Sequence, residues 1–411
     1  MTVGVGATIG FCLSMLLVSG PMRRFSALKG KYTLSAFFSE RYGRDASLIL
    51  SGLILLLFPA YIIPQLLGAG HATQYVLGID FNTAVIVVSI VFVMYTLIGG
   101  MLSVAWTDFI QGILMFIAMV GLALYAVYHF GGPARLVEQA SAAKPGLSFL
   151  GLDPKIPWTT FAGFSLTIVV GVLSFPHVVM LFFAAKSVKK GRQALCLTAT
   201  LCLLFHLVGY FGIAGGALIL KPDLPRDQID KAYLVVMDAL CHPIARGVAV
   251  AGILSAIMST TSALLLVVGA EFSNNVYKRL IRPDASDTQV IRAGQLLMLV
   301  VGVVTTLLAL RQDKTIGEIA GILVGGVGST FAVPLIAGLW WRRATQAGCI
   351  ASMACGFISY GLAYFFFSWP KFSWTLLSLP LSILAMIIGS LVSSPPPERT
   401  RKLLAEMHTE E

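Results

Sequence analysis

The sequence contains few charged residues for its length. Of its 411 residues only 12% are charged while 57% are hydrophobic, and the mean hydropathy is +0.85. A soluble domain of ordinary composition carries about 25% charged residues. Because so many apolar side chains could not be buried in a water-soluble core, the composition excludes a soluble protein and predicts a membrane protein.

Motifs typical of enzymes and metal sites are also missing. The sequence has no Walker A element, no HExxH and no GxSxG, and its histidines show no metal-ligand spacing. Its six cysteines form no CxxC pair, which argues against a zinc site and against a disulfide framework. We therefore expect neither an enzyme nor an ATP-driven pump, and we expect no cofactor.

Long apolar segments make up most of the chain. A membrane-spanning helix needs about 20 mostly apolar residues, and eleven segments qualify. Their ranges are 2–20, 46–69, 83–101, 106–129, 159–183, 194–219, 246–272, 290–310, 316–341, 347–367 and 373–394. The sequence therefore predicts an all-α polytopic membrane protein with a single transmembrane domain over residues 1–411.

Basic residues are concentrated in alternate connections between these segments. If the N-terminus lies outside, 19 of the 29 lysines and arginines fall on the inner side, and the rest lie mainly in the loops 130–158 and 220–246. Cytoplasmic connections carry such an excess, so we predict an inner-membrane protein with its C-terminus in the cytoplasm. The net charge of +10 then reflects the orientation of the chain in the membrane, and attraction to membrane lipids is a secondary effect. We expect no nucleic-acid partner.

The first apolar segment begins almost at residue 1. No basic n-region precedes it and no signal-peptide cleavage site follows it. A first helix whose N-terminus lies outside, with almost no sequence before it, is difficult for the insertion machinery to place in the membrane. We therefore expect that upstream sequence is missing.

The seventh segment places three oxygen-bearing groups together. Ala256, Ser259 and Thr260 have the spacing i, i+3, i+4, which puts them on one helical face within a single turn. A carbonyl oxygen and two hydroxyl oxygens can hold a hard cation such as sodium. Small and hydroxyl residues also mark close helix packing, so both interpretations stay open on the pattern alone.

The fifth segment contains a predicted helix break. Pro176 lacks a backbone N–H and clashes with the preceding turn, and secondary transporters build midplane sites from such discontinuous helices. Ser174, Phe175 and His177 flank the break and are candidates for the substrate path. A simple proline kink, with His177 bonded to a neighbouring helix, is the alternative.

Lone polar residues in other segments have two interpretations each. Gln65 either faces the substrate path or bonds a neighbouring helix. Ser329 follows several glycines and precedes Pro334, a pattern that indicates packing or a hinge as well as ligand contact. Asp108, after the Gly99–Gly100 turn, either caps the next helix, as Thr107 could, or lines an inward cation exit.

Taken together, these segments resemble the sodium/solute symporter family. The resemblance rests on YTLIGGMLSVAWTDFIQ at 95–111, on SAIMSTTSALLLVVGAEFSNNVYK at 255–278, on FPHVVMLFFAAKSVKKG and on GLWWRRATQAG. Within the family these motifs resemble the pantothenate-type branch most, and the proline and monocarboxylate carriers nearly as much. One departure is Leu181, where family members often have an arginine, which puts an inherited gate or anion contact in doubt.

The resemblance implies a LeuT-like fold of two inverted repeats. Residues 1–129 would be the remainder of the first repeat, without its first core helix, and residues 159–341 the second repeat. Residues 347–394 would form two peripheral helices and 395–411 a cytoplasmic tail. The resemblance also implies that the Ala256 carbonyl and the Ser259 and Thr260 hydroxyls bind one sodium ion.

The expected function is sodium-coupled symport of a small organic solute, pantothenate-like or another small carboxylate or amino acid. The partners are then this solute, Na⁺ as the coupling ion, and membrane lipids, while the oligomeric state is left open. A transport-inactive fragment, or a membrane scaffold or sensor with the same fold, is the alternative. Proton coupling through His177 is a further one, although no intramembrane acid pairs with it.

Overall fold

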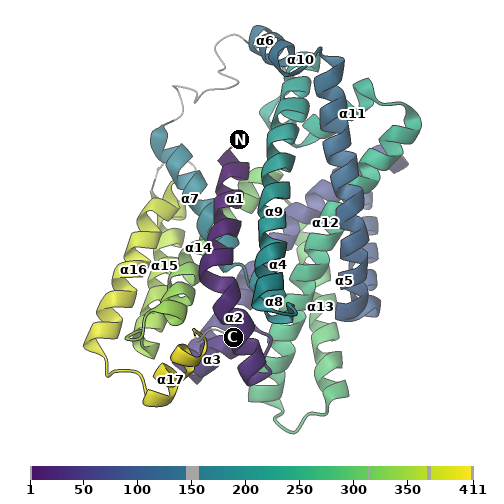
Figure 1. Ribbon diagram of the computed structural model, residues 1–411. Helices are drawn as coiled ribbons and strands as arrows, with labels where there is room; N and C mark the ends of the chain where they lie inside the picture. Colours follow the sequence, from purple (N-terminus) through teal and green to yellow (C-terminus); the bar gives the residue numbers. More distant parts are fainter. Residues whose placement is uncertain (1, 145–156, 313, 368–371, 409–411) are drawn as a thin grey trace.

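A computed structural model describes residues 2–144, 157–312, 314–367 and 372–408, all of them helical or in short connections (Figure 1). Part of the predicted outer loop 130–158 lies outside these residues. In chain order the helices are α1 (Thr2–Ser14), η1 (Met15–Ser19), α2 (Gly20–Lys29), α3 (Leu34–Tyr42), α4 (Arg44–Leu77), α5 (Phe81–His129), α6 (Pro133–Ala143), α7 (Trp158–Ser174), α8 (Pro176–Ala184), α9 (Val188–Gly209), η2 (Tyr210–Gly215), α10 (Gly216–Leu220), η3 (Arg226–Lys231), α11 (Ala232–Leu240), α12 (Pro243–Glu271), η4 (Phe272–Ile281), α13 (Asp287–Ala309), α14 (Ile316–Trp340), α15 (Gln346–Phe366), α16 (Trp374–Val392) and α17 (Glu398–Glu406).

The predicted eleven spans are confirmed. Within the described residues, 11 helical stretches are long and apolar enough to cross a membrane, and each overlaps one predicted segment. Several helices run further than the apolar segments, the first to Lys29 and the seventh to Ile281. Hydropathy marks the lipid-facing part of a helix, whereas the helix itself ends at a cap such as Gly30, whose φ of 60° is left-handed.

The glycine-rich helix α14 is packed closely in the centre of the molecule. A Cβ atom added at Gly328 would lie 2.6 Å from Val170 Cγ2 and 2.8 Å from the backbone nitrogen of Gly171, both on α7. The helix is unbroken although it contains Pro334. Of the interpretations offered for this segment, close packing is confirmed by the backbone approach between α7 and α14, while the hinge stays a prediction.

The predicted break in the fifth span is confirmed. α7 ends at Ser174, Phe175 is extended with φ −61° and ψ 119°, and α8 begins at Pro176.

The turn predicted at Gly99–Gly100 also exists, because Gly100 has φ 60° and ψ −174° and interrupts α5. The prediction that Thr107 or Asp108 caps the helix after this turn is wrong. The span after the turn runs from Val104 to His129, so both residues lie inside the helix.

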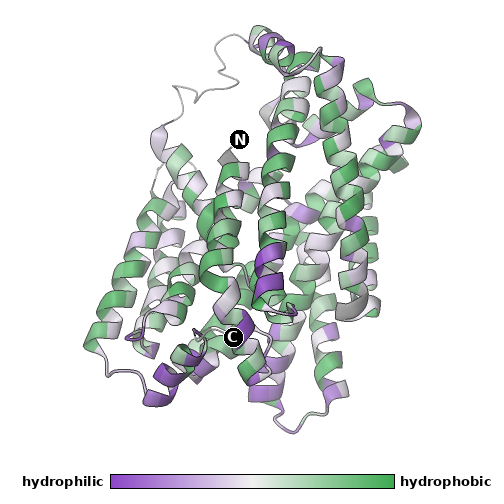
Figure 2. Cartoon of the chain, viewed as in Figure 1, coloured by the Kyte–Doolittle hydropathy of each residue, from purple (hydrophilic) through white to green (hydrophobic). Residues whose placement is uncertain are grey.

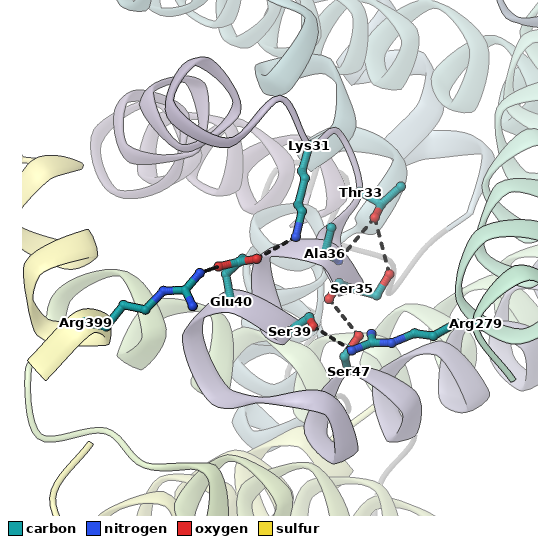
Figure 3. Close-up of polar contacts among 9 residues, drawn as sticks. All are labelled: Lys31, Thr33, Ser35, Ala36, Ser39, Glu40, Ser47, Arg279 and Arg399. Carbon is teal, nitrogen blue, oxygen red and sulfur yellow. Dashed lines mark hydrogen bonds and ion pairs between the residues drawn. The ribbon is translucent and has the colours of Figure 1, made fainter. Parts of the chain in front are cut away.

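The connections predicted to be cytoplasmic gather at one end of the molecule, around α3. Figure 3 shows Glu40 between Lys31 and Arg399, with nitrogen–oxygen distances of 2.5 and 3.5 Å, and Ser39 accepting a bond from Arg279. The buried Arg41 donates to the carbonyl oxygens of three residues at and beyond the end of α14, Gly338, Trp341 and Ala344. Hydrophilic residues are frequent at this end (Figure 2). The structure thus brings the predicted inner connections onto one face, while the side of the membrane stays a prediction.

Candidate functional site

The three predicted sodium ligands converge on α12. The Ser259 Oγ and the Thr260 Oγ1 each lie 3.1 Å from the carbonyl oxygen of Ala256. All three residues are half-buried, unlike the neighbouring Thr261, which is 1% exposed. Because the hydroxyl groups donate back to the helix, this cluster of oxygens satisfies its own hydrogen bonds and needs no further partner. The i, i+3, i+4 geometry expected from the sequence is therefore present.

Asp108 of α5 lies next to α12, at a residue that follows this cluster within one helical turn. Its side chain neighbours the Ser262 hydroxyl of α12, and Ser262 Oγ donates to the carbonyl of Ser259 at 2.9 Å. The Oδ1 atom of Asp108 is buried and has no hydrogen-bond partner. A carboxylate oxygen with a free acceptor site next to hydroxyl groups is a group that a hard cation favours. The role of Asp108 on an inward cation route stays a prediction.

An aromatic cluster surrounds the break between α7 and α8. The His177 ring lies 5.0 Å from Phe175 and 5.9 Å from Phe58 of α4, measured between ring centroids. The Nδ1 atom of His177 is buried without a hydrogen-bond partner. The Nδ1 atom therefore makes no bond to a neighbouring helix.

Helix α4 supplies the face opposite the break. Tyr61 stacks on Phe175 with a centroid distance of 5.5 Å and an interplanar angle of 26°. Gln65 is half-buried one turn further along α4. A Cβ atom added at Gly68, which follows on the same face, would lie 3.1 Å from the Ile257 side chain of α12. The break, this face of α4 and helix α12 are therefore neighbours.

Two of the predicted substrate-path residues occupy other environments. Ser174 is fully buried, and its hydroxyl donates to the Val170 carbonyl at 2.7 Å. Ser329 is also fully buried, and its hydroxyl is 2.7 Å from that of Ser378 on α16. The Ser174 bond lies within α7, whereas the Ser329 contact joins α14 to α16.

A buried carboxylate that the sequence reasoning overlooked joins three helices. Glu271, at the end of α12, is 2% exposed, and its Oε2 accepts bonds from Ser35 of α3 at 2.5 Å, Ser51 of α4 at 3.0 Å and Asn275 of η4 at 2.7 Å. An acid within an apolar segment is a functional suspect by default, so the signal was available in the sequence. All three of these hydrogen-bond partners are neutral.

Solved structures show which fold these helices form. A Na⁺-coupled sialic acid symporter in a substrate-bound outward-open state superposes with a TM-score of 0.79 at 19% identity, covering 97% of this chain and 85% of its own. The nucleobase-cation-symport-1 family transporter Mhp1 in a closed conformation gives a TM-score of 0.59 at 15% identity, covering 98% of this chain and 89% of its own. The chain therefore has the LeuT-like fold of sodium symporters.

Sequence comparison identifies the family. The model of the sodium:solute symporter family matches residues 1–356. The osmoregulated proline transporter OpuE of Bacillus subtilis is 30% identical over 409 residues, covering 95% of this chain and 80% of its own length. The high-affinity proline transporter PutP of the same organism is 29% identical over 399 residues, covering 92% and 82%. The chain belongs to the sodium:solute symporter family.

Proposed function

We propose that this protein is a sodium-coupled symporter that carries proline across the inner membrane. The proposal rests on family membership, on the proline transporters among its relatives, and on the three oxygens gathered on α12. Those relatives favour proline over the pantothenate-like solute expected from the motifs. The observation that carries the coupling mechanism is the convergence of Ser259 and Thr260 on the Ala256 carbonyl.

In this mechanism sodium binds to α12 first. The Ala256 carbonyl and the Ser259 and Thr260 hydroxyls turn from each other to the ion, and Asp108 lines its route toward the cytoplasm. Sodium binding favours the state that accepts substrate, and reciprocity requires substrate to raise the affinity for sodium by the same factor. Rocking of one group of helices against the other then alternates access.

The substrate path in this proposal runs between α4 and the helix break. Tyr61, Phe175 and His177 present aromatic faces on which an apolar pyrrolidine ring can pack, and the free Nδ1 of His177 and the Gln65 amide offer polar contacts. Buried polar groups without a partner are costly in free energy, so a substrate group that bonds to them gains most there.

We assign helices α1–α5 to the first repeat and α7–α14 to the second, with α15 and α16 peripheral.

Uptake into membrane vesicles tests this function. Vesicles containing the protein receive an inward Na⁺ gradient and radiolabelled L-proline, with an equal K⁺ gradient as the control. We expect accumulation of proline only with Na⁺, and no competition by excess unlabelled pantothenate. Uptake that is the same with either cation contradicts sodium coupling, whereas sodium-dependent uptake of pantothenate but not of proline contradicts the proposed solute.

A further inference from the structure

A basic pocket of about 560 Å³ lies beside the C-terminal helix α17. Its walls include Arg342 and Arg343, which follow α14, and Arg401 and Lys402 of α17, together with one acid, Glu398. With four basic side chains and one acidic side chain the pocket has an excess of positive charge. Neither the proposed sodium site nor the proposed substrate path includes any of these residues.

The pocket lies close to the end of α16, because Arg343 in its wall donates to the Leu391 and Ser393 carbonyl oxygens. This helix ends at Val392, which is 84% exposed, and its neighbour Leu391 is 60% exposed. Trp340, at the end of α14 immediately before the two arginines, is 47% exposed, and tryptophans of this kind mark the membrane interface. Figure 2 shows α16 as mainly hydrophobic and α17 as largely hydrophilic. A ligand in the pocket can therefore have a polar group among the basic residues and apolar chains along α16.

Arg343 has an unused donor at this position. One terminal nitrogen donates to the carbonyl oxygens of Ser393 at 2.7 Å and Leu391 at 3.4 Å, which fixes the guanidinium against the end of α16. The other terminal nitrogen, Nη1, is buried and has no hydrogen-bond partner. A buried donor without an acceptor costs free energy, and a small rotation of the guanidinium toward a phosphate oxygen in the pocket would remove that cost.

The acid in the pocket does not neutralise the site. Glu398 pairs with Lys402 at 3.1 Å, but their side chains are 73% and 71% exposed. Ion pairs this exposed contribute little because water and salt screen them. Lys402 can therefore turn to a phosphate at small cost, while Glu398 opposes an anionic ligand.

We propose that this pocket binds the phosphate-bearing headgroup of an anionic membrane lipid. Arg342, Arg343, Arg401 and Lys402 surround the phosphate, and the acyl chains lie along the exposed end of α16. Basic pockets at the ends of spanning helices recognise anionic headgroups through this combination of charge and location. The bound lipid links α17 to the ends of α14 and α16.

Thermal unfolding of the purified full chain in detergent, with and without added lipid, tests this site. Dioleoyl phosphatidylglycerol raises the Tm more than phosphatidylcholine with the same chains, because a ligand that binds the folded state stabilises it. The triple variant R342Q/R401Q/K402Q removes three phosphate partners and keeps Arg343, which holds α16. We expect its affinity for phosphatidylglycerol to fall by about tenfold or more. The control K189Q/K190Q/R192Q removes three exposed charges at the start of α9 and keeps the wild-type affinity.

A second variant, which should bind the lipid more tightly, distinguishes loss of the site from misfolding. Glu398→Gln removes the one acid of the pocket, so phosphatidylglycerol should bind this variant more tightly than the wild type. Equal losses in the triple variant and its control would show that only overall surface charge matters and would overturn the site. If glycerol phosphate without acyl chains raises the Tm as much as the lipid does, the ligand is a free phosphate and the lipid assignment is wrong.

Discussion

Tyr61 stacks on Phe175, with ring centroids 5.5 Å apart and 26° between the ring planes. The contact joins the middle of α4 to the one extended residue between α7 and α8. In the proposed mechanism it forms one wall of the substrate path, so its removal should affect the solute more than the ion.

Replacing Tyr61 by alanine should therefore weaken apparent affinity for proline. An aromatic contact of this kind contributes about 0.5–1.5 kcal/mol beyond buried area, which corresponds to a roughly 2- to 12-fold rise in the proline concentration at half-maximal uptake. Tyr61→Phe keeps the ring and should retain most of the affinity, with Na⁺ activation unchanged in both variants. An alanine variant with wild-type proline affinity would exclude Tyr61 from the substrate path.

Removing the carboxylate of Glu271 should destabilise the whole protein. Ser35, Ser51 and Asn275 would each lose a buried acceptor, at a cost of about 3 kcal/mol in total. Thermal unfolding of Glu271→Ala in detergent measures this loss. Glu138→Ala, which removes an exposed carboxylate from α6, is the matched control and should leave the Tm unchanged. Equal Tm values for the two variants would show that the buried network contributes nothing.

The approach between α7 and α14 predicts different effects for two glycines of the same helix. A side chain at Gly328 would collide with Val170 and with the backbone of Gly171, whereas Gly317 has no atom within 4 Å of an added Cβ. Overpacking costs about 1–3 kcal/mol, so Gly328→Ala should lower the Tm and Gly317→Ala should not. An unchanged Tm for both alanine variants would mean that α7 and α14 can move apart without loss of stability.

The ion pairs of Glu40 predict a dependence of stability on pH. The hydrogen bond from Lys31 lowers the pKa of the Glu40 carboxyl from its ordinary value of 4.5. A carboxylate with a lowered folded-state pKa stabilises the protein fully above pH 4.5, and this contribution disappears as the pH falls through the lower, folded-state value. The Tm difference between wild type and Glu40→Gln should therefore be present at pH 7 and shrink below pH 4.5. A difference that is constant over this range would contradict the pairing.

Much of the fold could be predicted because lipid imposes simple requirements on a sequence. Each span needs an apolar run of a certain length, and Pro176 cannot continue a hydrogen-bonded helix. The short helices α3, α6, α11 and α17 were not predicted, because they lie outside the apolar runs and depend on contacts such as Arg399 with Glu40. The exact helix ends also depend on caps rather than on hydropathy.

The site could be predicted only where its residues share one helical turn. Ala256, Ser259 and Thr260 are close in sequence, so their convergence follows from helix geometry alone. The partnership of Phe58 and Tyr61 with Phe175 was missed because α4 is apolar on all sides, which hides the face that meets the break. Glu271 was missed although a lone acid in an apolar segment is visible in the sequence.

The sodium dependence of proline uptake in a matched pair of α12 variants tests whether sodium binds at Ala256, Ser259 and Thr260. Ser259 and Thr260 are replaced together in S259A/T260V, while T261V removes a hydroxyl that donates to the Ile257 carbonyl at 2.8 Å on a buried face of the same helix. We expect the Na⁺ concentration for half-maximal uptake to rise about tenfold or more in the double variant, at a net cost of about 1 kcal/mol for each lost ligand, and to stay at the wild-type value in T261V. An unchanged Na⁺ concentration in S259A/T260V would contradict the sodium site on α12.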